Sequence, residues 1–222
     1  MAIATTGAER GIAFDSLHPD YRAVVETYLK AVDAELVTLP TKEGIADLNV
    51  LKGELEDGIA AVLVQQPNFF GLLEPMHEFG AMIKDSAAMF VACVNPISLG
   101  ILEPPGAYGA DIVVGEGQSL GNPLAYGGPS FGFMATKSKY IRRMPGRIVG
   151  ETADKDGKRG FVLTLQTREQ HIRRQRATSN ICTNAAHSAL MGAVYLAMLG
   201  KEGLREVASH CAQKAHYTAK QI

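Results

Sequence analysis

Short apolar runs that alternate with helix-like segments constrain the fold of this chain more than any other feature. The runs are rich in β-branched residues and are Ala34–Leu39, Ala60–Gln65, Met89–Val94 and Ile112–Val114. We expect each run to be a strand that is buried on both sides of a sheet. Apolar residues recur at helical spacing in Leu17–Ala31, Leu73–Ala87 and, less regularly, Ile45–Leu55. Strands that alternate with helices predict an α/β fold whose sheet is mostly parallel and has helices on both faces.

Composition and charge exclude several classes of protein. The 222 residues are 46% hydrophobic and 20% charged, which is typical of a globular protein, and a formal charge of -1 favours neither nucleic acid nor an anionic membrane. Cys93, Cys182 and Cys211 lack the CxxC spacing of a zinc site, and their odd number argues against a disulfide framework. No apolar run is long enough to cross a membrane, and the first residues do not resemble a signal peptide. We therefore expect a cytoplasmic protein without a metal site.

The alternation breaks after Gly127. A strand is expected at Phe131–Thr136, a hairpin at the polar turn Asp154–Gly160, a strand at Phe161–Thr167, and a helix at Ile181–Leu199. That helix is apolar nearly all round, so we expect it to be buried and to end at Gly200. A further helix begins at Glu202, and the sequence stops inside it. The abrupt end suggests that a domain is missing.

Polar and glycine-rich residues follow three of the predicted strands. They are Gln65–Gly71, Asn95-Pro96 and Gly115–Ser119. In parallel α/β sheets ligands bind beyond the carboxyl ends of the strands, so a site is expected where these segments meet. Turn formation by Pro, Asn and Gly alone explains the same residues.

Several longer stretches are specific enough to resemble one known family. They are Gln65-Gln66-Pro67-Asn68-Phe69-Phe70-Gly71, Gly115-Glu116-Gly117-Gln118-Ser119-Leu120-Gly121, Met144-Pro145-Gly146-Arg147, and Leu165–Arg174 with Ala177–Thr183. Together they resemble subunit 1 (alpha) of the P-protein of the glycine cleavage system. The resemblance runs from about Leu17 to the end of the chain.

The resemblance implies the fold-type I architecture of pyridoxal-phosphate (PLP) enzymes. The family decarboxylates glycine on PLP and passes the aminomethyl group to the lipoyl arm of the H-protein. In its two-subunit form, a heterotetramer, the lysine that holds PLP covalently belongs to subunit 2 (beta). The resemblance then implies that this chain covers only part of subunit 1: an N-terminal segment at 1–16, the later part of the large domain at 17–200, and the start of the small domain at 201–222. On its own we expect the chain to be inactive.

Two positions argue that this chain holds no PLP covalently. A PLP site of this fold needs a carboxylate facing the pyridine nitrogen and a lysine for the Schiff base. The family resemblance implies these groups at the positions of Asn95 and Ser119. An amide does not hold a protonated pyridine nitrogen as a carboxylate does, and a hydroxyl cannot form the Schiff base. Lys137 and Lys139 follow a strand, but they are expected to be solvated residues at the start of a surface helix.

Other residues are candidates for contacts with the partner's site. Thr178, Ser179 and Asn180 precede a long helix, where they either bind the phosphate of the partner's PLP or cap the helix. Gly127-Gly128-Pro129 allows a close backbone approach or forms a turn. His171 is a possible proton shuttle or an interface residue, and Cys182 is a redox-sensitive or a buried thiol. Arg142, Arg143 and Arg147 form a solvated face or a docking site for the H-protein, and Asn68 lies either at the site or in a turn.

Two further functions remain open from the sequence. The chain could be an assembly partner with no residue in the site, or an independent fold-type I PLP enzyme. A nucleotide-binding Rossmann protein is disfavoured because no GxGxxG motif follows an early strand and no P-loop is present.

Overall fold

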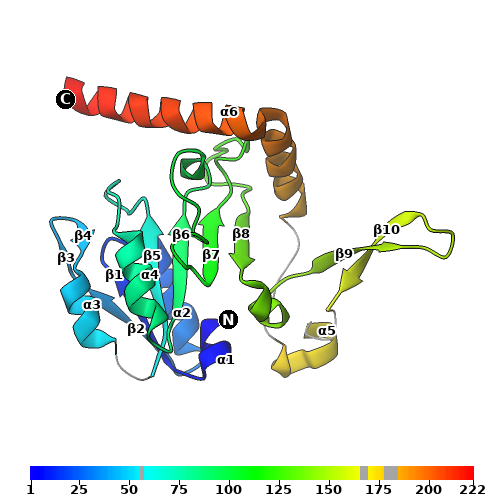
Figure 1. Cartoon of the computed structure of the whole chain (residues 1–222), viewed down its shortest axis with the longest axis horizontal. Coiled ribbons are helices and arrows are strands. Elements are labelled where there is room, and N and C mark those ends of the chain that lie inside the picture. Colours follow the sequence, from blue (N-terminus) through cyan, green and yellow to red (C-terminus); the bar gives the residue numbers. More distant parts are fainter. Residues whose placement is uncertain (56–57, 166–169, 178–184) are drawn as a thin grey trace.

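The main body of the protein is a six-stranded sheet with helices on both faces (Figure 1). The computed structural model describes residues 1–55, 58–165, 170–177 and 185–222. The strands of the sheet are β1 (Arg10–Phe14), β2 (Glu35–Leu39), β5 (Ile59–Gln66), β6 (Met89–Val94), β7 (Ile112–Glu116) and β8 (Gly132–Thr136). Their order is β2-β1-β5-β6-β7-β8, and all neighbours are parallel except β7 and β8. The predicted α/β fold with a mostly parallel sheet is confirmed.

Four helices flank the sheet. They are α1 (Ala2–Thr6), α2 (Pro19–Lys30), α3 (Leu48–Glu54) and α4 (Met76–Lys84). Helix α2 begins where the sequence favours it, because His18 Nδ1 accepts from the Asp20 amide and Pro19 occupies the first turn. The segment expected as one helix at Ile45–Leu55 is instead the small hairpin of β3 (Thr41–Lys42) and β4 (Ile45–Ala46), followed by α3. Asp47 ends the hairpin and caps α3, since its carboxylate accepts from the Asn49 amide.

The larger hydrophobic core lies between the sheet and helices α3 and α4. Phe14, Phe79 and Phe90 are almost completely buried there, and their rings pack in sequence with centroid distances of 5.6 and 6.4 Å. Burial of each such ring contributes about 2–3 kcal/mol. Every residue of β6 is buried, as the sequence predicted, because this strand has a neighbour on each side and apolar cover on each face.

The opposite face of the sheet is covered less completely. Helix α1 and the segment before α2 pack on it through Met1 and Leu17, but α2 itself contains no buried residue. The outermost strand β2 is also only partly buried, with Glu35 and Thr38 exposed. The prediction that β2 is buried on both sides is wrong, because an edge strand has only one neighbour.

The N-terminal region contains a central strand that the sequence pattern did not predict. β1 lies between β2 and β5, and its residues Ile12 and Ala13 have no exposed surface. Arg10–Phe14 is too short to show a period, and its apolar run is only the three residues Ile12–Phe14. This strand therefore belongs to the same sheet as the strands after residue 17.

A separate antiparallel hairpin extends away from the main sheet (Figure 1). It consists of β9 (Ile148–Ala153) and β10 (Arg159–Thr164), as the polar turn predicted. Asp154 Oδ1 closes the turn by accepting from the amides of Asp156 and Lys158. The short helical turns of this region are η2 (Ser138–Arg143), α5 (Gln170–Arg173) and η4 (Arg174–Arg176), while η1 (Ser98–Gly100) follows β6.

The last element, α6 (Ala186–Gln221), corrects the expectation of a buried helix. Leu190, Val194 and Met198 are 60%, 50% and 82% exposed, and the helix buries only Ser188, Gly192 and Ala208. One side of α6 packs on the loops after β6 and β7, and nothing in the described part of the chain covers the other side. Gly200 has φ 59° and ψ −171°, so the helix breaks there, at the predicted residue.

Candidate functional site

The carboxyl ends of β5, β6 and β7 meet at one edge of the sheet. The strand register sets Gln65 beside Cys93 and Cys93 beside Val114. A cavity of about 200 Å³ lies at this edge and is lined by Tyr21, Gln65, Cys93, Val94, Asn95, Glu116, Gln118 and Ser119. We call it the edge pocket. The fold thus brings Asn95 and Ser119, which are 24 residues apart in the sequence, to the same cavity.

Asn95 organises the turn after β6 rather than facing the pocket with a free acceptor. Its Oδ1 accepts from the Ile97 amide at 2.9 Å and the Ser98 amide at 3.4 Å. The Ser98 hydroxyl in turn donates to the Asn95 carbonyl at 2.7 Å. The acceptor oxygen of Asn95 is therefore already used by the backbone.

Ser119 contributes a hydroxyl that is unsatisfied. Its Oγ is buried and has no hydrogen-bond partner among the described residues. The neighbouring Gln118 is fixed, because its amide donates to Glu116 Oε1 at 2.9 Å and its side-chain NH₂ donates to the Asn122 carbonyl at 2.7 Å. A buried hydroxyl without a hydrogen-bond partner costs free energy, so Ser119 Oγ is the clearest unsatisfied hydrogen-bonding group of the pocket.

Sequence reasoning gave no individual role to three residues of the pocket, although Glu116 lies in the predicted site segment Gly115–Ser119. Tyr21 comes from α2, Cys93 from the buried strand β6, and Glu116 from the end of β7. Burial raises the pKa of the Cys93 thiol to about 11. Burial, then Cys93 and Glu116, raise the pKa of Tyr21. Glu116 stood inside a quoted glycine-rich stretch and could have been found, whereas nothing in the sequence marks Tyr21.

The edge pocket does not fit PLP. None of the described residues that line it is a lysine, an arginine or a histidine, so these residues supply neither an amine for a Schiff base nor a cation for a phosphate. Glu116 adds a carboxylate, which repels a phosphate. Asn95 and Ser119 offer an amide and a hydroxyl instead of the acid and the amine.

The glycines of the loop after β7 are required by packing. A Cβ at Gly115 would lie 2.4 Å from both Phe133 and the Val94 carbonyl. A Cβ at Gly117 would lie 2.4 Å from the Phe131 ring, which also excludes a side chain at Gly192. Two aromatic rings of the chain itself therefore explain these glycines, without a ligand.

The other glycine-rich segment is a turn. Gly127 and Gly128 have φ angles of 105° and 153°, and the Gly128-Pro129 peptide is cis. A Cβ at Gly127 would meet nothing within 4 Å, and one at Gly128 would meet only the Ser130 amide at 3.8 Å. Backbone conformation, and not a close approach within the described chain, accounts for glycine here.

Asn68 is a structural residue of the loop after β5. Its side-chain NH₂ donates to the Gly44 carbonyl and to Glu74 Oε1, both at 2.8 Å. Its Oδ1 accepts from the amides of Phe70 and Leu72 at 3.0 Å. All four bonds stay within the loop and its support, as expected for the turn interpretation.

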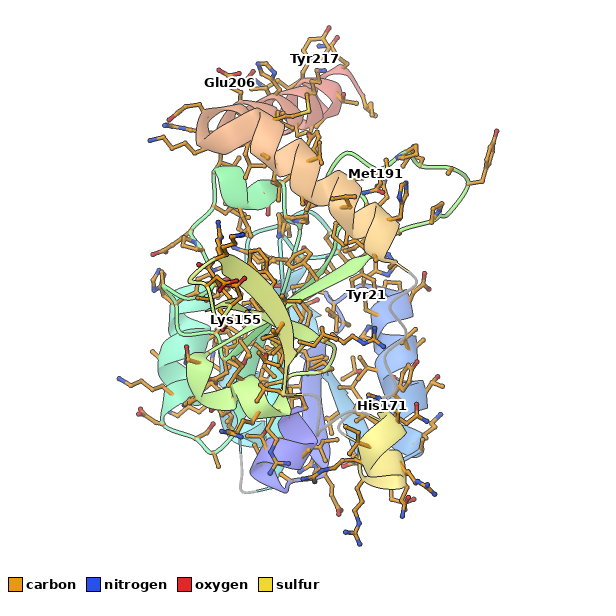
Figure 2. The ribbon with its side chains drawn as sticks, turned by 90° about the vertical axis from the view of Figure 1, so that its right-hand side faces the viewer. Tyr21, Lys155, His171, Met191, Glu206 and Tyr217 are labelled. Carbon is orange, nitrogen blue, oxygen red and sulfur yellow. The ribbon has the colours of Figure 1, made fainter. Side chains whose placement is uncertain are left out.

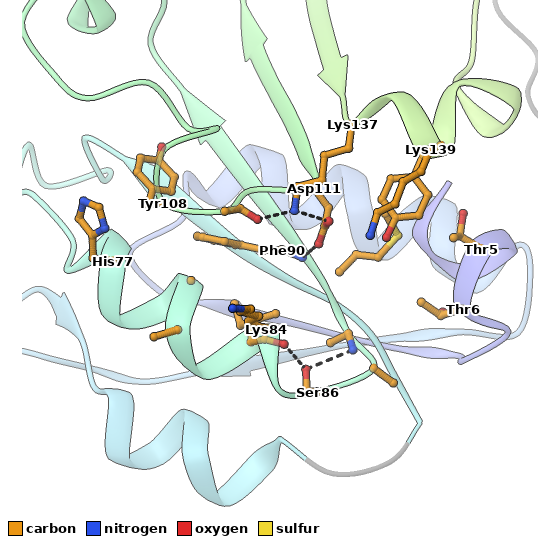
Figure 3. Close-up of a pocket in the computed structure, with 18 of the residues that line it drawn as sticks. Thr5, Thr6, His77, Lys84, Ser86, Phe90, Tyr108, Asp111, Lys137 and Lys139 are labelled. Carbon is orange, nitrogen blue, oxygen red and sulfur yellow. Dashed lines mark hydrogen bonds and ion pairs between the residues drawn. The ribbon is translucent and has the colours of Figure 1, made fainter.

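Lys137 and Lys139 lie at the opposite edge of the sheet, next to a larger cavity of about 750 Å³ (Figure 3). Lys137 Nζ contacts Asp111 Oδ1 at 2.8 Å and the Gly109 carbonyl at 3.0 Å, and Asp111 also accepts from the Phe90 amide. Lys137 is thus paired and not simply solvated, while Lys139 is fully exposed beside Tyr140. The cavity lies at the amino ends of β6 and β7, which is not where parallel α/β sheets bind their ligands.

Several candidates lie on exposed surface or outside the described residues. Thr178, Ser179, Asn180 and Cys182 are among the residues that the structure does not describe. His171 is exposed on α5 (Figure 2), and Arg142, Arg143 and Arg147 are exposed around η2. The described residues contain no cluster of three or more His, Cys, Asp or Glu that could hold a metal ion. Across the same residues, no helix has the length and hydropathy needed to span a bilayer.

Comparison with known proteins identifies close relatives. The family model described as "Glycine cleavage system P-protein" matches residues 2–222, so the similarity begins earlier than the expected Leu17. The chain is 54% identical to "Probable glycine dehydrogenase (decarboxylating) subunit 1" of Carboxydothermus hydrogenoformans over 222 residues. That alignment covers 100% of this chain and 50% of the relative. The chain thus spans about half the length of the curated relatives it matches.

Solved structures agree on the fold. A crystal structure of glycine decarboxylase (P-protein) of the glycine cleavage system, in inhibitor-bound form, matches with a TM-score of 0.93 and 53% identity. The match covers 97% of this chain and 48% of that one. Mouse CSAD in apo form matches with a TM-score of 0.65 at 13% identity, over 97% of this chain and 44% of that one, and supports the fold alone. The fold-type I architecture is confirmed.

Proposed function

The chain belongs to the glycine cleavage system P-protein family, and we propose that it acts as part of subunit 1 of a glycine dehydrogenase (decarboxylating). In this proposal PLP is held covalently by subunit 2, and the chain completes and stabilises that site. The assembled enzyme, a cytoplasmic heterotetramer, decarboxylates glycine and passes the aminomethyl group to the lipoyl group of the H-protein. PLP supplies the electron sink for this reaction.

One observation carries the proposal. The pocket at the carboxyl edge has the position of a fold-type I site but is lined by Asn95 and Ser119, with no cation beside them. A chain with this pocket needs a second polypeptide to supply the reactive centre. The names of the relatives, which call them subunit 1, support such a partner.

The residues Thr178, Ser179 and Asn180 are proposed to reach the phosphate of the partner's PLP. Support comes from the charge just upstream, where Arg174 and Arg176 are exposed on η4. Hydroxyl and backbone N–H donors with nearby cations suit a phosphate.

Reductive trapping and reconstitution test the proposal. The purified chain is incubated with PLP and borohydride, and its peptides are searched for a phosphopyridoxyl label. PLP absorbance and glycine–bicarbonate exchange are then measured for subunit 2 alone and with the chain. We expect no label on the chain, and exchange that requires both polypeptides. A label on a lysine of this chain would instead indicate an independent PLP enzyme.

The phosphate contact has its own test. Thr178→Ala with Ser179→Ala should weaken PLP binding by the complex about tenfold, the effect of losing roughly one hydrogen bond to an anion. Thr218→Ala, at an exposed position near the end of α6, is the control. If the double variant binds PLP as tightly as the wild type, the chain is an assembly partner without a residue at the phosphate.

A further inference from the structure

Positive and negative residues are concentrated in different parts of this chain, although its net charge is close to zero. Residues 137–177 carry twelve Lys and Arg against four Asp and Glu, a net charge of +8. The rest of the chain carries ten Lys and Arg against nineteen Asp and Glu, a net charge of −9, so that the total charge is −1. The described part of this basic segment, 137–165 and 170–177, contains η2, the β9–β10 hairpin, α5 and η4. We call it the basic lobe.

Most of the positive charge of the basic lobe is not neutralised by neighbouring carboxylates. Ion pairs join Lys137 to Asp111 and Arg159 to Glu151, both at 2.8 Å. Arg142, Arg143, Lys155, Lys158 and Arg176 are exposed, and no described carboxylate lies within ion-pair distance of them. Figure 2, which views the molecule from the side of the lobe, labels Lys155 on the hairpin and His171 on α5.

The hairpin of the lobe also exposes apolar side chains. Phe161, Val149 and Val162 are 63%, 58% and 48% exposed. The register sets Phe161 opposite Glu151 and Val162 opposite Gly150, so both faces of the ribbon carry exposed apolar surface. The strands contact each other, and no other described element packs extensively on them. A two-stranded ribbon with this surface is marginally stable in water, and a partner that covers it would stabilise it.

We infer that the basic lobe is a docking surface for an acidic face of subunit 2, with Phe161 and Val149 as its apolar centre. This inference rests on the proposed function, because the name of the relatives implies the partner. The combination of unneutralised cations with exposed apolar residues fits a protein surface better than a nucleic acid. A nucleic acid would be bound mainly through phosphate contacts.

The inference is tested by measuring the affinity of the chain for subunit 2 with calorimetry at low and high salt. Lys155→Glu with Lys158→Glu reverses two exposed charges and should raise the Kd about tenfold at low salt and less at high salt, because salt screens exposed charges. Phe161→Ala should raise the Kd about tenfold at both salts, because it removes apolar contact at the centre of the interface without changing the charge.

Matched controls lie on α6, with Met198 before the break at Gly200 and Lys214 and Lys220 after it. Lys214→Glu with Lys220→Glu makes the same change in charge, and Met198→Ala shortens an apolar side chain that is 82% exposed. Both should leave the Kd within about twofold. Circular dichroism of every variant checks that the fold is retained.

The outcomes separate this inference from the proposed function. If the wild type binds subunit 2 but the lobe variants bind equally well, or no worse than the controls, the docking surface is wrong and the proposed function stands. If the wild type does not bind subunit 2, the proposed function falls and the inference with it. Nucleic-acid binding that is lost in the lobe variants, with subunit binding unchanged, would also overturn the inference.

Discussion

Side chains at the carboxyl edge of the sheet decide what the edge pocket can do. Asn95 uses its oxygen to hold the turn after β6, and Ser119 presents a buried hydroxyl without a partner. Cys93 lines the same pocket and is buried, with 9% of the residue exposed. Among the described residues that line the pocket, Glu116 is the one acidic side chain and no basic side chain is present.

The Cys93 thiol should be unreactive in the folded chain. Burial raises its pKa from 9.0 to about 11, so little thiolate is present at pH 8. Site-resolved mass spectrometry after iodoacetamide treatment should show fast labelling of the exposed Cys211 and slow labelling of Cys93. In guanidinium both should react at similar rates. Rapid labelling of Cys93 in the native chain would contradict its burial.

The same shift predicts how stability depends on pH. A folded-state pKa above the unfolded value means that the unfolded chain loses its proton first as pH rises. The contribution of Cys93 is therefore complete below pH 9 and decreases as pH rises from 9 to about 11. The free energy of unfolding of the wild type, measured with urea, should decrease as pH rises through this window. In Cys93→Ala the free energy of unfolding should depend less steeply on pH.

Asn68 should be among the most sensitive positions for stability. Asn68→Ala leaves the Gly44 carbonyl, Glu74 and two backbone amides without their partner, at a cost of about 3 kcal/mol. Urea unfolding measures the loss, and Asn49→Ala, at an exposed position of α3, is the control with a change within about 0.5 kcal/mol. A loss as small as that of the control would show that the loop is held by other contacts.

At the scale of elements, the break in α6 separates two helical pieces that have different surroundings. The first piece packs on Phe131 through Gly192, and the second approaches η1 so closely that a Cβ at Gly100 would lie 2.7 Å from the Leu204 carbonyl. Gly200 redirects the chain between them (Figure 1). The positive φ of this residue thus permits both contacts.

Gly200 and Gly53 should respond in opposite directions to replacement by alanine. A Cβ would meet nothing within 4 Å at either position, so only the backbone conformation distinguishes them. Gly200→Ala forces a side chain into a region that glycine alone adopts readily and should destabilise by about 1–3 kcal/mol. Gly53→Ala lies within helix α3 and should stabilise by about 0.5–1 kcal/mol. Thermal unfolding measures the change in stability of each variant. If both substitutions changed stability in the same direction, the kink at Gly200 would be contradicted.

At the scale of the whole molecule, the described chain leaves large apolar and basic surfaces uncovered. Leu190, Val194 and Met198 of α6 are exposed, and so are the apolar residues of the hairpin. Exposed apolar surface of this extent is typical of contact with another polypeptide. The proposed dependence on subunit 2 belongs to this scale, because a fold-type I site needs groups that no lining residue of the edge pocket provides.

Restoring two residues should therefore not create a PLP site. The double variant Asn95→Asp, Ser119→Lys regains an acid and an amine, but the pocket still lacks a cation for the phosphate and retains Glu116. We expect no Schiff-base absorbance from this variant with PLP in the absence of subunit 2. The wild-type chain with subunit 2 is the positive control. A yellow double variant would show that the two substitutions alone explain the lost site.

The sequence by itself determined the class of the fold and predicted that the chain lacks the acid and the lysine of a PLP site. Apolar runs such as Met89–Val94 identify strands because a strand inside a sheet has apolar neighbours on both faces. The prediction that Asn95 and Ser119 stand where PLP enzymes of this fold carry the acid and the lysine rests on the motifs that flank them, which is local information. The resemblance to the P-protein family rested on such motifs, and the family match confirmed it.

Only the tertiary structure decided where surfaces lie and which distant residues meet. It placed β1 inside the sheet, left α6 largely exposed, and added Tyr21, Cys93 and Glu116 to the edge pocket. Burial depends on what the rest of the chain places against an element, which an apolar pattern cannot specify. For the same reason, the isolation of the basic lobe became visible only when the position of the hairpin was known.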